Sequence, residues 1–206
     1  EMGRSVYNEL DKLDPAKTGQ VRISNDRDDV RYNLYVQPDS KVAPNYASLS
    51  QDAFRQNDVI LIGKYTGITN RPLMNDIWMF RYTDMLLALA EKHAFDGNLT
   101  GVVGLGNYTN VESIIFNIRA NRNFTGAIEP VSMPTNFSTT KEAYARILEE
   151  RRVEFAFEGH RYLDMKRLGV KAGSPGFVRD AQDCASTGAC RLETNTFKST
   201  LPIPRA

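Results

Sequence analysis

The chain has 206 residues, of which 41% are hydrophobic and 25% are charged, a composition close to that of average soluble globular domains. It therefore disfavours intrinsic disorder, a collagen-like repeat and a membrane-spanning protein, and no stretch approaches the roughly 18 consecutive apolar residues of a membrane helix. The 26 basic and 25 acidic residues leave a net charge of +1 and are scattered along the chain. No basic surface is expected, so we predict no nucleic-acid partner.

Residues 1–75 are rich in turn-forming residues and contain two segments with strand-like patterns. Residues 30–36, VRYNLYV, alternate apolar and polar side chains, which is typical of a half-buried strand. Residues 58–65, DVILIGKY, form a short apolar run that is typical of a buried strand. Between them, prolines and serines predict a long loop over residues 37–57.

Residues 76–169 are predicted to be mainly helical. In residues 76–95, DIWMFRYTDMLLALAEKHAF, apolar side chains cover more than half of the helix circumference, so we expect a well-buried helix. Gly97 follows at a plausible helix end. A second helix is expected over residues 111–122, VESIIFNIRANR, which has isoleucines along one side.

A third helix is predicted to begin at Thr139, because Thr139 and Glu142 have the spacing of a capping box. Gly159 is expected to interrupt this helix, and a shorter continuation should end near Gly169. The tail, residues 170–206, is expected to be loop-like and ends in LPIPRA, whose prolines favour extended backbone.

Cys184 and Cys190 lie close together on either side of the segment ASTGA. A disulfide across this short loop would contribute roughly 2 kcal/mol and would indicate an oxidising compartment. Two free thiols are the other interpretation, and the sequence leaves both open. The CxxC spacing of a redox or zinc motif is absent.

Residues 150–169, ERRVEFAFEGHRYLDMKRLG, concentrate acids, arginines, aromatic residues and a histidine. His160 and Asp164 would share a helix face near Glu158, which raises the hypothesis of a metal site. Zinc sites usually draw on several His or Cys ligands, however, and the only other histidine, His93, is in a different segment. We therefore predict no metal and no cofactor.

The acids of the same segment could alternatively serve as the two carboxylates of a glycosidase. They alternate with arginines, and helical spacing would pair Arg151 with Glu154, Glu158 with Arg161, and Arg161 with Asp164. Neighbouring cations lower the pKa of a carboxyl group, whereas a catalytic acid needs a raised one. We therefore expect these five side chains to form a largely buried, mutually hydrogen-bonded scaffold.

Other catalytic motifs are missing or incomplete. The glycines of GVVGLGNYT, residues 101–109, are spaced GxxGxG, the reverse of the dinucleotide fingerprint, and no Walker lysine follows. A GxSxG nucleophile elbow is also absent. The residues alone thus argue against most enzyme classes without naming a function.

The segment 150–169 closely resembles the C-terminal motif of the SusD/RagB family, which has the pattern ERR-x-E-[LF]-AFEG-x-R-[WY]-x-D-[LM]-[KR]-R. Further resemblances occur in the family's order and cover nearly the whole chain. They are IGKYTG at 62–67, FRYTDMLLALAE at 80–91, NIRANRN at 117–123, LPIPRA at 201–206, and Asp29-Val30-Arg31 with valine where the family has proline.

The resemblance implies a mainly α, tetratricopeptide-like SusD fold with long loops and a few short strands. It also implies a lipid-anchored protein of the outer-membrane surface in Bacteroidetes, seated on a SusC-like TonB-dependent transporter. Members of the family capture glycans, or in some cases peptides, and are not enzymes. A helical module that binds proteins or peptides is the alternative function.

Full-length members of the family are roughly twice as long and begin with a lipoprotein signal and several helices. The resemblance therefore implies that residues 1–206 are the C-terminal portion of a single SusD/RagB-type domain. The lipid anchor, and part of the ligand site, would lie on an N-terminal part, and hydrophobic surfaces of this chain would pack against it.

Ligand-binding residues are expected in loops that carry aromatic side chains, because sugars stack their C–H faces on such rings. Tyr46 in the 37–57 loop fits this expectation best, and Asn45 could bond a sugar hydroxyl beside it. Trp78 is the only tryptophan, but its place in an apolar helix favours a core position. Tyr7 is a weaker candidate.

Overall fold

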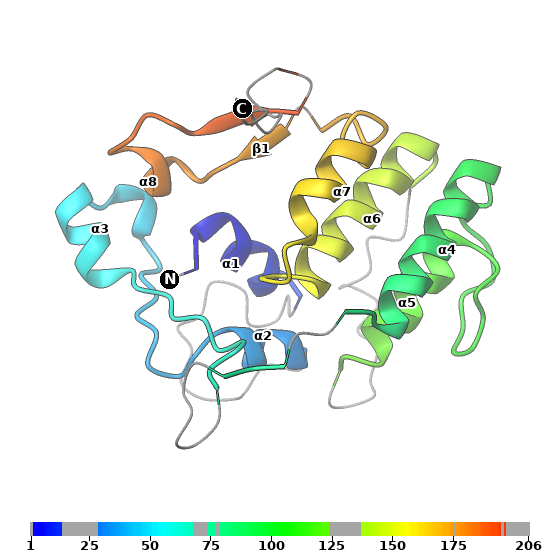
Figure 1. Ribbon diagram of the computed structural model, residues 1–206, viewed down its shortest axis with the longest axis horizontal. Helices are drawn as coiled ribbons and strands as arrows, with labels where there is room; N and C mark the ends of the chain where they lie inside the picture. The colour runs from blue at the N-terminus through cyan, green and yellow to red at the C-terminus, as the bar shows by residue number, and fades with distance from the viewer. Residues whose placement is uncertain are drawn as a thin grey trace, which may run out of the picture.

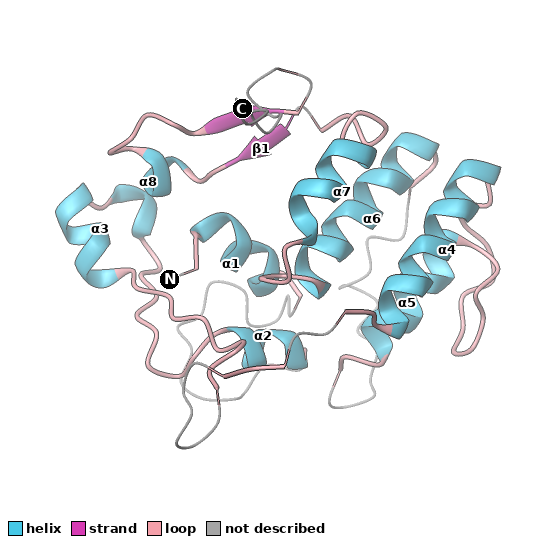
Figure 2. Cartoon of the chain, in the orientation of Figure 1, coloured by secondary structure: helices cyan, strands magenta, loops and turns pink. Residues whose placement is uncertain are grey.

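The computed structural model describes residues 2–13, 29–67, 74–76, 79–123, 137–174, 176–194 and 196. Within them the chain is mainly helical, with a single two-stranded sheet and long connections, which confirms the predicted fold class (Figures 1 and 2). The helices are α1 (Arg4–Asp11), α2 (Val30–Tyr35), the 3-10 helix η2 (Tyr46–Ser48), α3 (Gln51–Asn57), α4 (Tyr82–Asp96), α5 (Val111–Ala120), α6 (Thr140–Glu154), α7 (His160–Leu168) and α8 (Ala181–Cys184). The strands are β1 (Gly176–Val178) and β2 (Arg191–Glu193), which pair antiparallel.

Helices α4, α5, α6 and α7 pack side by side and enclose the larger hydrophobic cluster (Figure 1). Its centre is formed by Leu87 of α4, Ile114 and Ile115 of α5, Ile147 of α6 and Met165 of α7, which are all almost completely buried. Because each helix contributes one apolar stripe, burial of these side chains holds the four helices together.

Helix α6 begins as predicted. The Glu142 backbone N–H donates to the Thr139 hydroxyl at 3.2 Å, and the Glu142 carboxylate accepts from the Thr139 N–H at 3.1 Å. This capping box is confirmed. Gly159, with φ 83°, separates α6 from α7, and Gly97, with φ 80°, ends α4, so both expected glycine stops are also observed.

A second hydrophobic cluster joins α1 and α2 to the C-terminal end of α6. It contains Leu10 of α1, Tyr32 of α2 and Val153 of α6, together with Ile60 from the connection before α4. Because α6 contributes to both clusters, its C-terminal end is the place where the two parts of the core meet.

The predicted strand over residues 30–36 is wrong, because the segment forms helix α2. The Asp29 side chain accepts the Arg31 N–H at 2.9 Å and caps the helix. The helical turn buries Arg31, Tyr32 and Tyr35, whereas Leu34, expected to face inward, is 58% exposed. The period-two pattern assumes that polar side chains face solvent. It failed because Arg31, one of its polar positions, is buried in the core.

The segment 58–65 is extended but forms only isolated bridges, Lys41 with Val59 and Val36 with Ile62. Ile60 is buried between them, so the apolar run does mark a buried segment. The predicted loop over residues 37–57 is partly wrong, because it contains η2 and α3.

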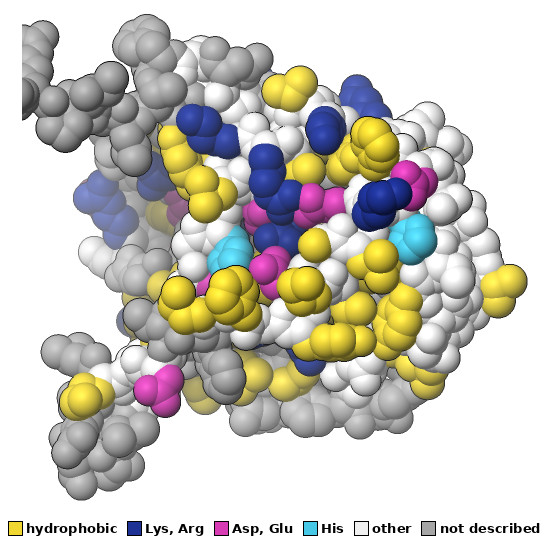
Figure 3. Space-filling model, turned by 45° about the vertical axis from the view of Figure 1, so that its right-hand side comes forward, with side chains coloured by type: hydrophobic (Ala, Val, Ile, Leu, Met, Phe, Trp, Pro, Cys, Tyr) yellow, Lys and Arg dark blue, Asp and Glu magenta, His cyan; other side chains and the backbone are white. Residues whose placement is uncertain are grey.

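Helix α4 starts later than predicted, at Tyr82, and it is not well buried. It buries Leu87, Ala90 and Ala94, but Tyr82, Met85 and other large apolar side chains face outward. The face that Figure 3 brings forward shows such hydrophobic side chains beside a band of basic and acidic ones. The prediction of a well-buried helix was therefore wrong.

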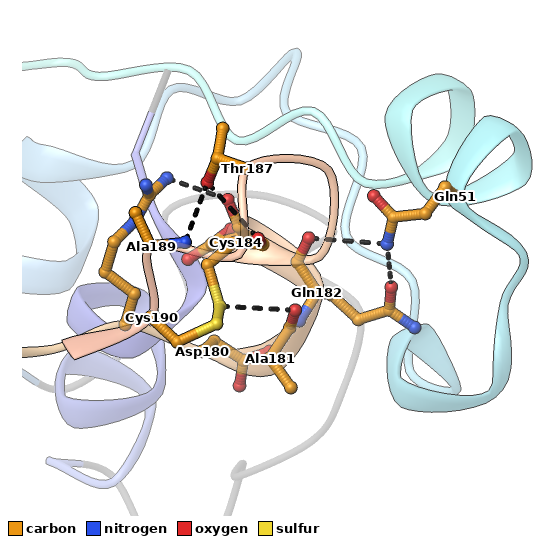
Figure 4. The surroundings of a disulfide bond; sticks show 10 residues. Gln51, Asp180, Ala181, Gln182, Cys184, Thr187, Ala189 and Cys190 are labelled. Carbon is orange, nitrogen blue, oxygen red and sulfur yellow. Dashed lines mark hydrogen bonds between the residues drawn. A yellow bond between two sulfur atoms is a disulfide. The ribbon is translucent and has the colours of Figure 1, made fainter.

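The tail after α7 contains β1, α8 and β2, so it is less loop-like than predicted. Cys184 and Cys190 are joined by a disulfide that connects α8 to the start of β2, with 5.1 Å between their Cα atoms (Figure 4). Beside it, the Gln182 side chain donates to the carbonyl oxygens of Tyr46 and Leu49, and so ties the tail to η2. The final segment LPIPRA lies outside the described residues.

Replacing both Cys184 and Cys190 with serine is expected to lower the free energy of unfolding by roughly 2 kcal/mol, the loop-closure value for so short a ring. Urea unfolding of the double variant measures the effect. Reduced wild-type protein should unfold at the same urea concentration as the variant, and a variant as stable as the oxidised protein would contradict the expectation.

Candidate functional site

A buried cluster of charged side chains occupies the centre of the molecule. Arg31 donates to Asp29 at 2.7 Å and to Glu150 at 2.5 Å, and it lies 3.3 Å from Glu154. Arg119 forms a second ion pair with Glu150, at 2.8 Å. Helix α2 is thereby fixed to α6 by interactions that span more than a hundred residues, and Arg119 joins α5 to the same Glu150 carboxylate.

These contacts govern the protonation of the cluster. Burial alone would raise the pKa of Glu150, but Arg119 and Arg31 outweigh it and lower that pKa to about 2. Burial is likewise outweighed at Glu154, where hydrogen bonding to Arg122 and the charge of Arg31 lower the pKa. Both acids are therefore ionised at neutral pH and serve as fixed anions.

The five side chains predicted to form a scaffold are found near one another, but their partners differ from those expected. Arg151, Glu154 and Asp164 are buried, while Glu158 and Arg161 are partly exposed as residues. Within the set, Arg151 lies 2.8 Å from Asp164, a charge contact that lacks hydrogen-bond alignment.

The remaining partners come from other helices and loops. Glu154 forms ion pairs with Arg31, Arg81 and Arg122, which lie outside residues 150–169. Glu158 forms ion pairs with Lys64 and Arg81. Arg161 donates a hydrogen bond to the Leu148 carbonyl oxygen at 3.0 Å. The predicted helical pairs were wrong, because most of these side chains reach partners on other elements, and Asp164 pairs along α7 with Arg167 instead of Arg161.

An open cleft of about 730 Å³ lies beside this cluster, and we call it the aromatic cleft. Its walls come from α2, the segments 63–65 and 80–83, Arg122 just after α5, and the C-terminal end of α6 with the turn that follows it. Its lining includes Leu34, Tyr35, Lys64, Tyr65, Phe80, Arg81, Tyr82 and Arg122, with Glu154 and Glu158 on the inner wall. A cleft of this size, apolar with a few charged groups, is typical of a ligand site.

Two aromatic rings at the rim of the aromatic cleft are open to solvent. Phe80 is 83% exposed and Tyr82 is 70% exposed. Arg81 between them has extended backbone, with φ −127° and ψ 149°. Residues on either side of an extended residue point to the same side, which explains why both rings border one cleft. Interaction with the Tyr82 hydroxyl raises the pKa of Tyr108, so the two hydroxyl groups lie near each other.

The inner wall of the aromatic cleft carries Lys64, Arg81 and Glu158. Lys64 lies 2.5 Å from Glu158 and donates to the Ala156 carbonyl oxygen at 3.0 Å, while Arg81 lies 2.9 Å from Glu158. Burial lowers the pKa of Lys64, although Glu158 opposes that shift. These charged groups are held in place before any ligand arrives, which reduces the entropy that binding would cost.

Tyr65, on the wall of the aromatic cleft, has a left-handed backbone conformation, with φ 64°. Such a conformation is costly for a non-glycine residue and is characteristic of functional sites. The preceding segment is held close to α2, since Gly63 donates to the Tyr35 carbonyl oxygen at 2.8 Å and a Cβ at Gly63 would collide with the Leu34 carbonyl oxygen. The turn therefore presents the Tyr65 ring to the aromatic cleft.

The sequence-predicted ligand residues lie elsewhere. Tyr46, in η2, is partly buried, its hydroxyl donates to Asp180 at 3.1 Å, and the Arg4 guanidinium lies 4.0 Å from its ring centroid. Tyr7 is 2% exposed and bonds the hydroxyl of Tyr32 at 2.9 Å, so its ring offers no face to a ligand.

Asn45 is exposed beside Tyr46, and neither residue lines the aromatic cleft. Trp78 lies outside the described residues. The residues that sequence reasoning missed are Lys64, Tyr65, Phe80, Arg81 and Tyr82. The sequence predicts Phe80 and Tyr82 within a buried helix. The one signal for an exposed pair is that these two aromatic residues flank Arg81 at the start of the helix.

In the part of the chain that the structure describes, no group of three or more His, Cys, Asp or Glu side chains is arranged to hold a metal ion. None of the described helices has both the length and the apolar character needed to cross a bilayer.

The sequence profile of the SusD family matches residues 3–199. No curated protein and no solved structure shows a significant match to the chain. The profile covers nearly the whole chain, including the buried cluster and the aromatic cleft. This chain therefore belongs to the SusD family of nutrient-binding proteins associated with the outer membrane.

Proposed function

We propose that this protein captures oligo- or polysaccharides in the aromatic cleft and delivers them to a SusC-like TonB-dependent transporter. It acts as a lipid-anchored binding protein at the cell surface, without catalysis. Membership of a nutrient-binding family supports the general role. The observation that carries the assignment to saccharides is the exposed pair Phe80 and Tyr82 beside fixed cationic groups.

A saccharide has the chemistry that this cleft offers. The C–H faces of a sugar ring stack on aromatic rings such as Phe80 and Tyr82. Its hydroxyl groups can accept hydrogen bonds from Lys64 and Arg81 and donate to Glu158. Because the aromatic cleft is open at its rim, it suits a chain of sugar units better than a small molecule that must be enclosed.

The proposal is tested by screening the protein on a glycan array and titrating the best oligosaccharide by calorimetry. Tyr82→Ala is expected to weaken binding about tenfold, which corresponds to about 1.4 kcal/mol of lost stacking. Tyr82→Phe keeps the ring and should retain most of the affinity.

Phe95→Ala is the matched control. Phe95 is 74% exposed near the other end of the same helix and does not line the aromatic cleft. Equal affinity losses in the Tyr82→Ala and Phe95→Ala variants would contradict the assignment to the aromatic cleft. Tyr46→Ala should lower stability without changing affinity, because its ring and hydroxyl are engaged by Arg4 and Asp180.

A protein- or peptide-binding module is the second candidate. The outward face of α4 carries Met85, Leu89 and Phe95, which are exposed apolar side chains on one helix. Exposed apolar patches of this kind favour contact with another protein. If no glycan binds and Phe95→Ala weakens binding to a purified SusC-like transporter, this second function replaces the first.

A further inference from the structure

A second cavity, of about 420 Å³, lies at the α6–α7 junction and shares no lining residue with the aromatic cleft. Helix α1, the turn between α6 and α7, and strand β1 enclose it. Its lining combines aromatic rings with guanidinium groups, and we call it the arginine cavity. The lining residues that matter are Phe155, Phe157, Phe177, Arg152, Arg161 and Arg179.

The arginines of this cavity differ in how well their charges are balanced. Arg151, which also lines it, is balanced by Asp84 at 2.9 Å and by Asp164 at 2.8 Å. For Arg152 and Arg161, no carboxylate of the described residues lies within 4 Å. Arg161 donates to the Leu148 carbonyl oxygen at 3.0 Å, which does not neutralise its charge.

Arg152 and Arg161 also repel one another. Burial, followed by the charge of Arg152, lowers the pKa of Arg161 to about 10. Burial lowers the pKa of Arg152 too, and the more distant carboxylates of Glu9 and Glu149 only partly oppose the shift. The charge of Arg152 thus disfavours that of Arg161 more than any one of the carboxylates of Asp164, Glu149 and Glu9 favours it, a cost that a bound anion would reduce.

From the arginine cavity and its two partly buried guanidinium groups that pair with no carboxylate in the described part of the chain, those of Arg152 and Arg161, we propose a second binding site that takes a carboxylate or sulfate group on an apolar body. Guanidinium groups bind such anions through paired hydrogen bonds, and the more accessible Phe157 and Phe177 rings of the lining suit an apolar face of the molecule that carries the anion. The identification of the anionic ligand as a saccharide rests on the proposed function. If both hold, the site selects acidic saccharides.

Calorimetry with trigalacturonate, a sulfated galactotriose and neutral galactotriose tests the proposal. Wild-type protein is expected to bind at least one acidic probe at least about tenfold more tightly than galactotriose. Arg152→Gln and Arg161→Gln should each remove most of this preference while leaving galactotriose affinity unchanged. Arg152→Lys should restore part of it, because lysine keeps the charge but not the paired hydrogen bonds.

Arg191→Gln is the matched control, since it removes the same charge from an exposed arginine on β2 that does not line the cavity. It should change affinity for the acidic probes less than about twofold. Equal affinity for acidic and neutral probes, or equal losses in all three glutamine variants, would overturn the proposal.

A thermal-shift titration with sodium sulfate separates this proposal from the proposed function. Sulfate should raise the Tm of the wild-type protein and of Arg191→Gln more than that of Arg152→Gln, at matched ionic strength. That result without any saccharide binding would support the anion site and contradict glycan capture. An equal sulfate-induced rise in Tm in the wild type and all variants would overturn the anion site. This conclusion would hold whether or not neutral saccharides bind.

Discussion

Glu150→Gln is expected to lower the free energy of unfolding by about 3–5 kcal/mol, the usual cost of removing one partner of a buried ion pair. The Glu150 side chain is 0% exposed and receives Arg31 at 2.5 Å and Arg119 at 2.8 Å. An amide keeps the shape but loses the charge, so two largely buried guanidinium groups would lose their shared counter-ion. Urea denaturation at pH 7 measures the difference.

Glu149→Gln is the matched control for this substitution. Glu149 is the preceding residue on α6, is about half exposed as a side chain, and pairs with Arg146 at the surface. Its loss should cost less than about 1 kcal/mol, as for other exposed pairs. Comparable stability changes in the two variants would show that the buried cluster does not hold the fold.

Acid is expected to remove part of the wild-type stability through the same residue. The pKa of Glu150 is about 2 in the folded protein, below the value of about 4.3 in an unfolded chain. A lowered folded-state pKa adds stability that is fully present above the unfolded-state pKa and is lost as pH falls through the folded-state pKa. The contribution is roughly 3 kcal/mol and disappears between about pH 5 and pH 2.

The measurement is the stability gap between the wild-type protein and Glu150→Gln, taken by urea denaturation from pH 7 down to the lowest pH at which the wild type folds. The gap should be constant above about pH 5 and shrink steadily below it. Glu149→Gln should follow the wild-type curve in parallel. A gap that stays constant in acid would place the low pKa of Glu150 in doubt.

The cluster that stabilises the fold also builds the aromatic cleft. Glu154 and Glu158 fix Arg81, and Glu158 fixes Lys64, so the cations of the aromatic cleft are positioned by acids of the scaffold. Substitutions in residues 150–169 should therefore change stability first and ligand affinity second.

Local signals in the sequence predicted much of the helical core correctly. The capping box at Thr139, the glycine stops at Gly97 and Gly159, and the isoleucine stripe of α5 all depend on neighbours within about one helical turn, so the sequence displays them directly. The fold class followed from the family resemblance and not from these signals.

Non-local interactions explain the failures. Residues 30–36 form a helix because Asp29 caps it and because Glu150 and Glu154, far along the chain, bind Arg31. No pattern within the segment contains that information. The partners of Arg151 and Glu158 were mispredicted for the same reason, since spacing along one helix says nothing about cations supplied by other segments.

The aromatic cleft was missed because of a boundary error. Extending the predicted helix back to residue 76 placed Phe80 and Tyr82 in a core, whereas the helix begins at Tyr82 and leaves both rings exposed. Tyr46 was favoured because it lies in a predicted loop, but tertiary contacts with Arg4 and Asp180 occupy it.

A crystal structure of the protein with its best-binding oligosaccharide tests the central claim most directly. A sugar ring stacked on Phe80 or Tyr82, with a hydroxyl bonded to Lys64 or Arg81, is the result that the proposed function predicts. An oligosaccharide bound at Tyr46, or elsewhere with the aromatic cleft empty, would contradict it.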